Sequence, residues 1–344
     1  MKRIGLLTSG GDAPGMNAAI RAVVRSGIYF GMEVYGIERG YAGLIEDTVV
    51  PMEMRSVSNI VQAGGTKLRT ARCLEMLTVE GQKKAVDTLE KHGIEGLVVI
   101  GGDGSFRGAK VLSEKYGVPT IGIPGTIDND IVCTEDTIGF DSSMNIITDC
   151  ISKLRDTSET LDRCSVIEVM GAGAGWMALE GGIAAGADIM LVPEVEFDFQ
   201  KDVIDLIKAK KESGQNYFVI VIAECVFFPE SNRKHKKNKN FQYVNENGIE
   251  TVEKFTKKFQ EMSGIESRAT VLGHIQRGGA PTFHDCILAT NMGVHAVELL
   301  KNNKSARVVV VKDGKITDFD IDEGLAMKKP FDKDRLEMAT KLNF

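Results

Sequence analysis

The chain has little of what membrane-spanning, secreted or nucleic-acid-binding proteins carry in excess. Only 6% of its 344 residues are aromatic, with a single Trp, and no apolar run approaches the ~18 residues of a membrane-spanning helix. No signal peptide precedes the first apolar stretch, so we expect a soluble, cytoplasmic protein. The formal net charge of −6 argues against broad binding to nucleic acid or to an anionic membrane. Any anion site must be a local cluster of Arg and Lys.

The chain also lacks the cysteine pairs of zinc sites and disulfide frameworks. Its six cysteines show no CxxC pair and no zinc-ligand spacing, so we expect free thiols in a reducing compartment. They are Cys73, Cys133, Cys150, Cys164, Cys225 and Cys286.

Glycine is abundant, and it recurs after apolar runs that are typical of buried strands. Strands are expected at 4–7, 33–37, 97–100, 120–123, 166–170, 189–192, 218–223 and 270–272. Helices are expected at 16–30, 81–92, 141–157, 200–213 and 251–262. This alternation predicts an α/β protein with mainly parallel sheets and helices on both faces, and the length fits two domains.

Two neighbouring strands lead into polar loops with complementary chemistry. The first leads into Gly101-Gly102-Asp103-Gly104-Ser105, a glycine turn that can bring backbone N–H groups and a helix N-terminus to a phosphate. The second leads into Pro124-Gly125-Thr126-Ile127-Asp128-Asn129-Asp130, which is rich in carboxylates. The two loops share one edge of the expected sheet. Together they indicate phosphoryl transfer, in which a cradle and a metal hold the donor while a carboxylate takes the proton of an alcohol.

Four motifs in order resemble the phosphofructokinase family, in particular its ATP-dependent bacterial type. Besides GGDGS and PGTIDND, they are TSGGDAPGMN at 8–17 and GHIQRGG at 273–279, and the similarity runs from Lys2 to about Leu342. The resemblance implies two Rossmann-like three-layer α/β/α lobes with mainly parallel sheets. These would be a nucleotide-binding lobe (1–139 plus 276–325) and a sugar-phosphate-binding lobe (140–275), with a C-terminal segment at 326–344.

The resemblance also implies a reaction. The family transfers a phosphoryl group from Mg²⁺-bound ATP to the C1 hydroxyl of fructose 6-phosphate, giving fructose 1,6-bisphosphate, a step of glycolysis. It does so as a homotetramer. The residues implied on the nucleotide side are Gly11, Tyr41, Arg72, Cys73, Gly102, Asp103, Gly104, Ser105 and Gly108.

Five of the implied residues carry the chemistry. Asp128 is the general base for the C1 hydroxyl, and Thr126 and Asp130 in its loop bind the transferring group or orient its partners. Asp103 is the candidate Mg²⁺ ligand, since a carboxylate there can hold a metal that bridges phosphates. Arg72 matches a residue that bridges donor and acceptor phosphates, a task that suits a planar, permanently charged fork.

The acceptor carries a 6-phosphate and therefore needs cations. In the family, the equivalents of Arg163 and Arg268 reach in from a neighbouring subunit, so the resemblance implies active sites shared between subunits. The full set implied for the acceptor is Thr126, Asp128, Arg163, Met170, Gly171, Glu224, Arg268, His274 and Arg277.

Two alternatives stay open at this stage. Diphosphate-dependent members of the family carry an acidic residue in place of Gly104 and a Lys in place of Gly125, so glycine at both positions favours a nucleoside triphosphate. The family usually has Arg where this chain has Ala172. A weakly active regulatory paralogue that binds sugar phosphate or nucleotide is therefore the second alternative.

The effector site of the family is only partly matched. Arg21, Arg25, Arg55 and Arg155 match positions that bind a regulatory phosphate, and Asp188 replaces a usual Glu. The lysines usual near 213–216 are absent, so we expect a weak response to effectors. A short basic run at 233–239 is expected to be a solvated loop, the alternative being an anion or partner contact.

Overall fold

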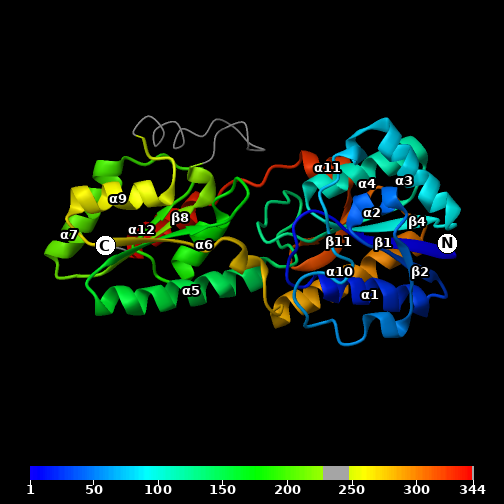
Figure 1. Cartoon of the computed structure of the whole chain (residues 1–344), viewed down its shortest axis with the longest axis horizontal. Coiled ribbons are helices and arrows are strands. Elements are labelled where there is room, and N and C mark those ends of the chain that lie inside the picture. Colours follow the sequence, from blue (N-terminus) through cyan, green and yellow to red (C-terminus); the bar gives the residue numbers. More distant parts are fainter. Residues whose placement is uncertain (228–247, 343–344) are drawn as a thin grey trace. The chain divides into compact units, whose positions relative to one another are not determined.

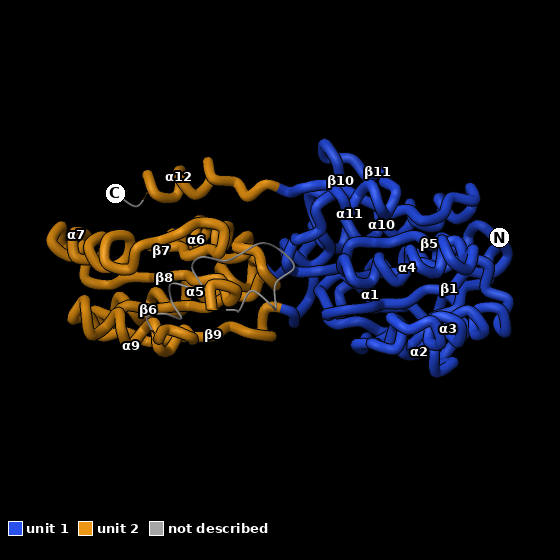
Figure 2. Tube along the Cα trace, turned by 90° about the horizontal axis from the view of Figure 1, so that it is seen from above, with its two compact units in different colours: residues 1–143, 277–329 blue, residues 144–276, 330–344 orange. Residues whose placement is uncertain are grey.

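The computed structural model describes residues 1–227 and 248–342, which form two compact units (Figure 2). Unit 1 holds residues 1–143 and 277–329, and unit 2 holds the described residues of 144–276 and 330–344. The chain therefore changes unit after Ser143, Gln276 and Lys329. The sequence-based division had its boundaries at 139/140, 275/276 and 325/326. The basic run at 233–239 lies outside the described residues.

Unit 1 is a twisted sheet between two layers of helices (Figure 1). The sheet runs β11-β10-β5-β4-β1-β2-β3 and consists of β1 (Arg3–Thr8), β2 (Glu33–Ile37), β3 (Val49–Met52), β4 (Gly96–Gly101), β5 (Thr120–Pro124), β10 (Arg307–Lys312) and β11 (Lys315–Asp320). One face is covered by α1 (Met16–Tyr29) and α10 (Phe283–Lys301). The other is covered by α2 (Gly40–Glu46), α3 (Val79–Lys91), α4 (Asp103–Tyr116) and α11 (Ile321–Ala326).

The central strands of unit 1 form because they are short, nearly continuous apolar runs that can be buried on both faces. All six residues of β4 are buried, as are five of the six in β1. The edge strands differ: β3 pairs antiparallel with β2, and β11 pairs antiparallel with β10. The sheet is therefore mainly parallel, as predicted, with one antiparallel strand at each edge.

Unit 2 is a smaller, fully parallel sheet in the order β7-β8-β6-β9. Its strands are β6 (Cys164–Val169), β7 (Ile189–Leu191), β8 (Phe218–Ala223) and β9 (Ser267–Val271). Its described helices are α5 (Phe140–Thr160, which begins in unit 1), α6 (Trp176–Ala184), α7 (Leu206–Glu212), α9 (Val252–Ser263) and α12 (Lys333–Leu342). In Figure 1 the sheet lies between α5 and α9.

Two element predictions in unit 2 need correction. The single helix expected at 200–213 is a π-helical segment, η3 (Phe199–Asp205), followed by α7. The strand expected at 270–272 is β9, which starts three residues earlier and ends at Val271. Both units nevertheless have the expected α/β architecture. Among the described residues, no helix combines the length and the apolar character needed to cross a membrane.

Candidate active site

Three loops of unit 1 lie side by side at the carboxyl edge of its sheet, because β1, β4 and β5 are parallel neighbours. The N–H of Ser9, after β1, donates to the carbonyl of Ile100 at 2.9 Å. The N–H of Gly125, after β5, donates to the carbonyl of Gly101 at 3.0 Å. These bonds fix the three loops against one another, so the residues predicted for the donor and for the base share one edge.

The loop after β4 is shorter than predicted. Gly102 is the N-cap of α4, and Asp103 is already the first helical residue, so the expected glycine turn is the first turn of a helix. The first N–H groups of a 14-residue helix have no partners within the helix and carry the positive end of its dipole. A Cβ placed on Gly102 or Gly104 would meet no atom within 4 Å, so this helix end is open to an incoming anion.

Tyr41 packs against Gly108 and is hydrogen-bonded to the first turn of α4. The Tyr41 hydroxyl donates to the carbonyl of Ser105 at 2.7 Å, and a Cβ on Gly108 would lie 2.8 Å from the Tyr41 ring. Tyr41 is only 4% exposed, and burial raises the pKa of its hydroxyl. Glycine at 108 is therefore required by close packing, and Tyr41 stabilises the first turn of α4.

The loop that carries Arg72 and Cys73 is attached to the loop after β1. The Thr8 hydroxyl donates to the carbonyl of Arg69 at 2.7 Å, and the Thr70 hydroxyl donates to the carbonyl of Gly10 at 2.8 Å. Arg72 is exposed, and Cys73 is partly buried against the core of unit 1. Arg72 is therefore an exposed residue on a segment that is hydrogen-bonded, through Thr70, to the loop after β1.

Arg277 lies beside Gly11, a contact that the sequence analysis did not anticipate. A guanidinium nitrogen of Arg277 donates to the carbonyl of Asp12 at 3.1 Å. A Cβ on Gly11 would come within 2.6 Å of that nitrogen. The Arg277 side chain therefore contacts the β1 loop directly, and any side chain at position 11 would displace it.

The loop after β5 holds its catalytic candidates by local hydrogen bonds. The Thr126 hydroxyl lies 3.3 Å from a carboxylate oxygen of Asp128 and accepts from the Asp128 N–H at 3.2 Å. The Thr137 hydroxyl donates to the carbonyl of Thr126 at 2.7 Å. Asp128 is 6% exposed, and Asp130 is more exposed than Asp128. Asp128 is thus a nearly buried carboxylate that is hydrogen-bonded within its own loop.

Asp103, at the open end of α4, suits a magnesium ion that is held mainly by phosphates. Within the described part of the chain there is no cluster of three or more His, Cys, Asp or Glu that could hold a metal by itself. Mg²⁺ commonly takes one or two carboxylates plus substrate phosphates and water. Asp103 provides such a carboxylate at the start of α4, and Arg107 lies 3.3 Å from it.

The carboxyl edge of the unit 2 sheet gathers part of the acceptor set. A carboxylate oxygen of Glu224, directly after β8, accepts from the N–H of Ala172 at 3.2 Å, next to Gly171. The N–H of Met170 donates to the side-chain carbonyl of Gln276 at 3.3 Å. Gln276 is fully buried and its amide donates to the carbonyl of Gly273, which fixes the 3-10 turn η6 (Gly273–Arg277) that carries the exposed His274.

Arg163 and Arg268 lie at the opposite edge of the same sheet. Arg163 directly precedes β6, and Arg268 is the second residue of β9. Both guanidinium groups contact one carboxylate oxygen of Glu266, at 3.1 Å and 2.7 Å respectively. Because β6 is six residues long, these arginines are roughly 20 Å from Met170 at its other end. The structure therefore divides the predicted acceptor residues of unit 2 between the two ends of its strands.

The carboxyl edge of unit 2 is also unusually acidic. Burial raises the pKa of the Glu168 carboxyl to about 7, and the negative charges of Glu224 and Glu253 raise it further. Glu168 lies in β6, two residues before Met170. The sequence analysis missed Glu168, because a lone acidic residue in an otherwise apolar strand gave no motif.

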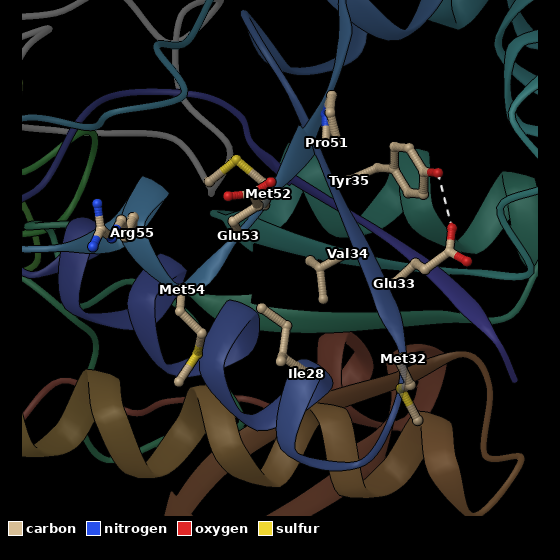
Figure 3. A pocket seen from close by; sticks show the side chains of 10 residues that line it. All are labelled: Ile28, Met32, Glu33, Val34, Tyr35, Pro51, Met52, Glu53, Met54 and Arg55. Carbon is tan, nitrogen blue, oxygen red and sulfur yellow. Dashed lines mark hydrogen bonds between the residues drawn. The ribbon is translucent and has the colours of Figure 1, made fainter.

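The effector candidates of unit 1 lie on α1 and on the short helix η1 (Met54–Val57). Arg21 and Arg25 are one helical turn apart on α1, which packs against η1. Arg55 lies beside a pocket of about 570 Å³ that is lined mainly by apolar side chains of α1, β2 and β3 (Figure 3). The other charged residues that line this pocket with Arg55 are Glu33 and Glu53. Two carboxylates beside a single Arg do not make a phosphate-binding site.

The effector candidates of unit 2 are occupied by contacts within the unit. Asp188 accepts from the Lys210 ammonium at 3.0 Å, the Gln215 amide at 2.8 Å and the Val219 N–H at 2.8 Å. Arg155 donates to the carbonyls of Ala185 and, at 2.9 Å, Gly186. Lys210 is thus present near this site, but its ammonium is paired with the Asp188 carboxylate.

A helix end that is open to an anion, next to a buried carboxylate loop in an α/β fold, is the arrangement of a phosphoryl-transfer enzyme. The comparisons with known proteins agree with this class. The family model described as Phosphofructokinase matches residues 3–300, and the chain belongs to this family. The resemblance stated from the four motifs is confirmed.

Relatives among curated proteins are similar over their whole length. The chain is 51% identical over 344 residues to the ATP-dependent 6-phosphofructokinase of Thermoanaerobacter pseudethanolicus, covering 100% of both chains. Solved structures of fungal phosphofructokinases are similar to it in fold. The Saccharomyces cerevisiae structure has a TM-score of 0.81 at 32% identity, and the Pichia pastoris structure in the T-state has 0.83 at 33%. Each alignment covers 99% of this chain but only 47% and 36% of the fungal chains.

Proposed function

We propose that this chain transfers the γ-phosphoryl group of ATP to the C1 hydroxyl of fructose 6-phosphate, with Asp128 as the general base. One observation carries the proposal: the open N-terminus of α4 and the nearly buried Asp128 follow the adjacent parallel strands β4 and β5, whose ends are joined by the bond from the Gly125 N–H to the Gly101 carbonyl. A phosphate bound at the first and an alcohol held at the second are neighbours. The matching curated relatives carry the name of this activity.

The chain's own residues divide the work as follows. The N–H groups at the start of α4 bind donor phosphates, and Arg72 neutralises charge on the group in transfer. Asp128 accepts the proton of the attacking hydroxyl, and the Thr126 hydroxyl orients the Asp128 carboxylate. Asp103, together with the donor phosphates, would hold a Mg²⁺ ion, which would supply charge to offset the negative charge of the donor.

The choice of donor rests on Gly104 and Gly125. Gly104 faces open space, so an ATP phosphate can approach the helix end. A Cβ at Gly125 would lie 3.0 Å from Ile100 and 3.1 Å from Met16, so the Lys of diphosphate-dependent relatives would need a shift of these side chains. Both features support a nucleoside triphosphate as the donor rather than diphosphate.

The acceptor site is completed by a second copy of the chain. Met170, Gly171, Glu224 and His274 contribute from the carboxyl side of the unit 2 sheet. Arg163 and Arg268, at the amino side, bind the 6-phosphate in the site of a neighbouring subunit of a homotetramer. Their separation of roughly 20 Å along the strands supports this division.

An initial-rate assay tests the proposed function. Fructose 6-phosphate is offered with ATP, GTP or diphosphate, each with and without Mg²⁺. We expect Mg²⁺-dependent formation of fructose 1,6-bisphosphate with a nucleoside triphosphate and none with diphosphate. Turnover with diphosphate alone would establish the first alternative. Binding of sugar phosphate with no turnover by any donor would establish the regulatory paralogue.

A further inference from the structure

Lys329 reaches the loop that carries Asp128 from a distant part of the chain. It is the last residue of unit 1, and the chain enters unit 2 at Pro330. Its ammonium donates to the carbonyl of Asn129 at 2.9 Å and lies 3.3 Å from the carbonyl of Thr134. These partners are 200 and 195 residues away in sequence. One side chain thus holds two backbone points of the loop, the first of them next to Asp128.

The segment that Lys329 bridges is also held by other hydrogen bonds, within itself and to β10, and one of its residues has an unusual backbone. Asn129 has a φ of +48°, in the left-handed region that a non-glycine residue adopts at a cost. Its side-chain amide donates to the carbonyl of Glu135 at 3.2 Å. The Thr134 hydroxyl donates to the carbonyl of Asp136 at 2.8 Å. The ammonium adds a second link between the two ends of the segment 129–134, beside the bond from Asn129 to Glu135.

Partial burial of the Lys329 ammonium costs free energy. This cost argues that its contacts with the loop have a function. Burial lowers the pKa of Lys329, while the charges of Asp136, Asp130, Cys133 and Glu135 act in the opposite direction. The side chain is half-buried, whereas its neighbour Lys328 is exposed. A lysine whose charge had no role would extend into solvent, as Lys328 does.

We propose that Lys329 is the positioning residue for Asp128. It holds the backbone of Asn129 in the left-handed conformation that sets the direction of the Asp128 carboxylate, and it touches neither substrate. This inference rests on the proposed role of Asp128 as the general base. A shift of about 1 Å in a catalytic group can reduce a rate by about 100-fold, so loss of the two contacts is expected to act on kcat.

The test compares Lys329→Met with the matched control Lys328→Met in the full-length enzyme. We expect Lys329→Met to lower kcat by about 10- to 100-fold while the KM values for ATP and fructose 6-phosphate stay within about twofold. Lys328→Met should keep the kcat of the unaltered enzyme. A kcat of Lys329→Met equal to that of Lys328→Met would overturn the proposal, and so would a loss confined to KM.

A double-mutant cycle with Asp128→Asn separates positioning from a general loss of structure. If Lys329 acts through Asp128, Lys329→Met costs about twofold or less in the Asp128→Asn background. Losses that multiply in the double variant would overturn the proposal. Should Lys329→Met fail to fold, Lys329→Gln and Lys328→Gln carry the same comparison: a several-fold lower kcat of the first supports positioning, and equal kcat values refute it.

The cycle also distinguishes failure of the inference from failure of the proposed function. An Asp128→Asn variant with unaltered kcat would remove the general base, and with it the residue that Lys329 is proposed to position. An inactive Asp128→Asn variant beside a fully active Lys329→Met variant would leave the general base in place and overturn only the role of Lys329.

Discussion

The two sheets of this chain use their edges differently. In unit 1, the start of α4 and Asp128, which are proposed to bind the donor and to remove the proton, follow the carboxyl ends of the adjacent parallel strands β4 and β5. In unit 2, the proposed acceptor residues are split, with Glu224 at the carboxyl edge and Arg163 with Arg268 at the amino edge. On the proposed assignment, unit 1 brings its donor and base residues to one edge of its sheet, whereas unit 2 divides its acceptor residues between two edges.

The largest expected effect is on the unit 1 side of this comparison. Asp128→Asn should lower kcat by about 10²–10⁴-fold, because loss of a general base typically has this cost. The KM values should change little. Steady-state kinetics measure both, and the melting temperature serves as the control for folding. A variant within threefold of the unaltered kcat would remove Asp128 from the mechanism.

A smaller effect is expected at the open end of α4. Gly104→Asp places a carboxylate where no protein atom lies within 4 Å, so the fold should tolerate it. Like charges held close together cost several kcal/mol, so kcat/KM for ATP should fall by about 100-fold or more. Gly104→Ala is the matched control with a side chain but no charge. Unchanged ATP kinetics in Gly104→Asp would show that this helix end does not bind the donor.

A third prediction concerns the acidic edge of unit 2. The folded-state pKa of Glu168 is about 7, above its ordinary value of 4.5, so folding favours the protonated form. Its contribution to stability is present below about pH 4.5 and is lost as the pH rises through 7. Glu168→Gln should therefore gain about 2 kcal/mol over the unaltered chain between about pH 5 and pH 8.

Hydrogen exchange of the β6 and β8 amides at these two pH values measures that difference. Equal protection of the two proteins at both pH values would mean that Glu168 titrates in unit 2 as it does in the unfolded chain.

The smallest effect is expected at the effector candidates, where Asp188 is already paired with Lys210. Saturation by fructose 6-phosphate should shift by less than about twofold with millimolar phosphoenolpyruvate or ADP, because coupling needs different affinities in two states. Phosphoenolpyruvate is the sharper probe, since it is not a product of the reaction. A strongly sigmoidal curve that ADP makes hyperbolic, and that changes in Arg155→Ala, would contradict this expectation.

Much of the fold could be predicted because buried strands are visible in the sequence as short apolar runs. Strands β2 and β8 have the predicted bounds, β5 is one residue longer at its end, and β4 is one residue longer at each end. The edge strands could not be found in this way: β3 has four residues, one of them Pro51, and β11 has only two apolar residues, Ile316 and Phe319, three positions apart. The π-helical segment η3 at the start of this helical region is only seven residues long. A π-helical turn this short cannot be distinguished from an α-helix by the spacing of apolar residues.

Residues of the candidate site could be predicted where they lie together in a sequence motif. Single residues that the fold brings to the site from elsewhere in the chain could not. Gln276 lies within a quoted motif, but nothing in the sequence shows its bond to Met170. Glu266 is two residues before Arg268, a spacing that places both on one face of a strand and could have been noticed. Lys329 has only the signal of preceding a proline, which favours an extended backbone.

The central claim is that the two edges of unit 2 serve different active sites, and mixed oligomers test it most directly. Asp128→Asn and Arg268→Ala are each expected to be nearly inactive as homo-oligomers at low fructose 6-phosphate. If Asp128 of one subunit works with Arg268 of another, a mixed pair rebuilds one intact site. Unfolding and refolding the two variants together should then restore about a quarter of the unaltered activity. A mixture that stays as inactive as its components would place both residues in the site of one subunit and contradict the account.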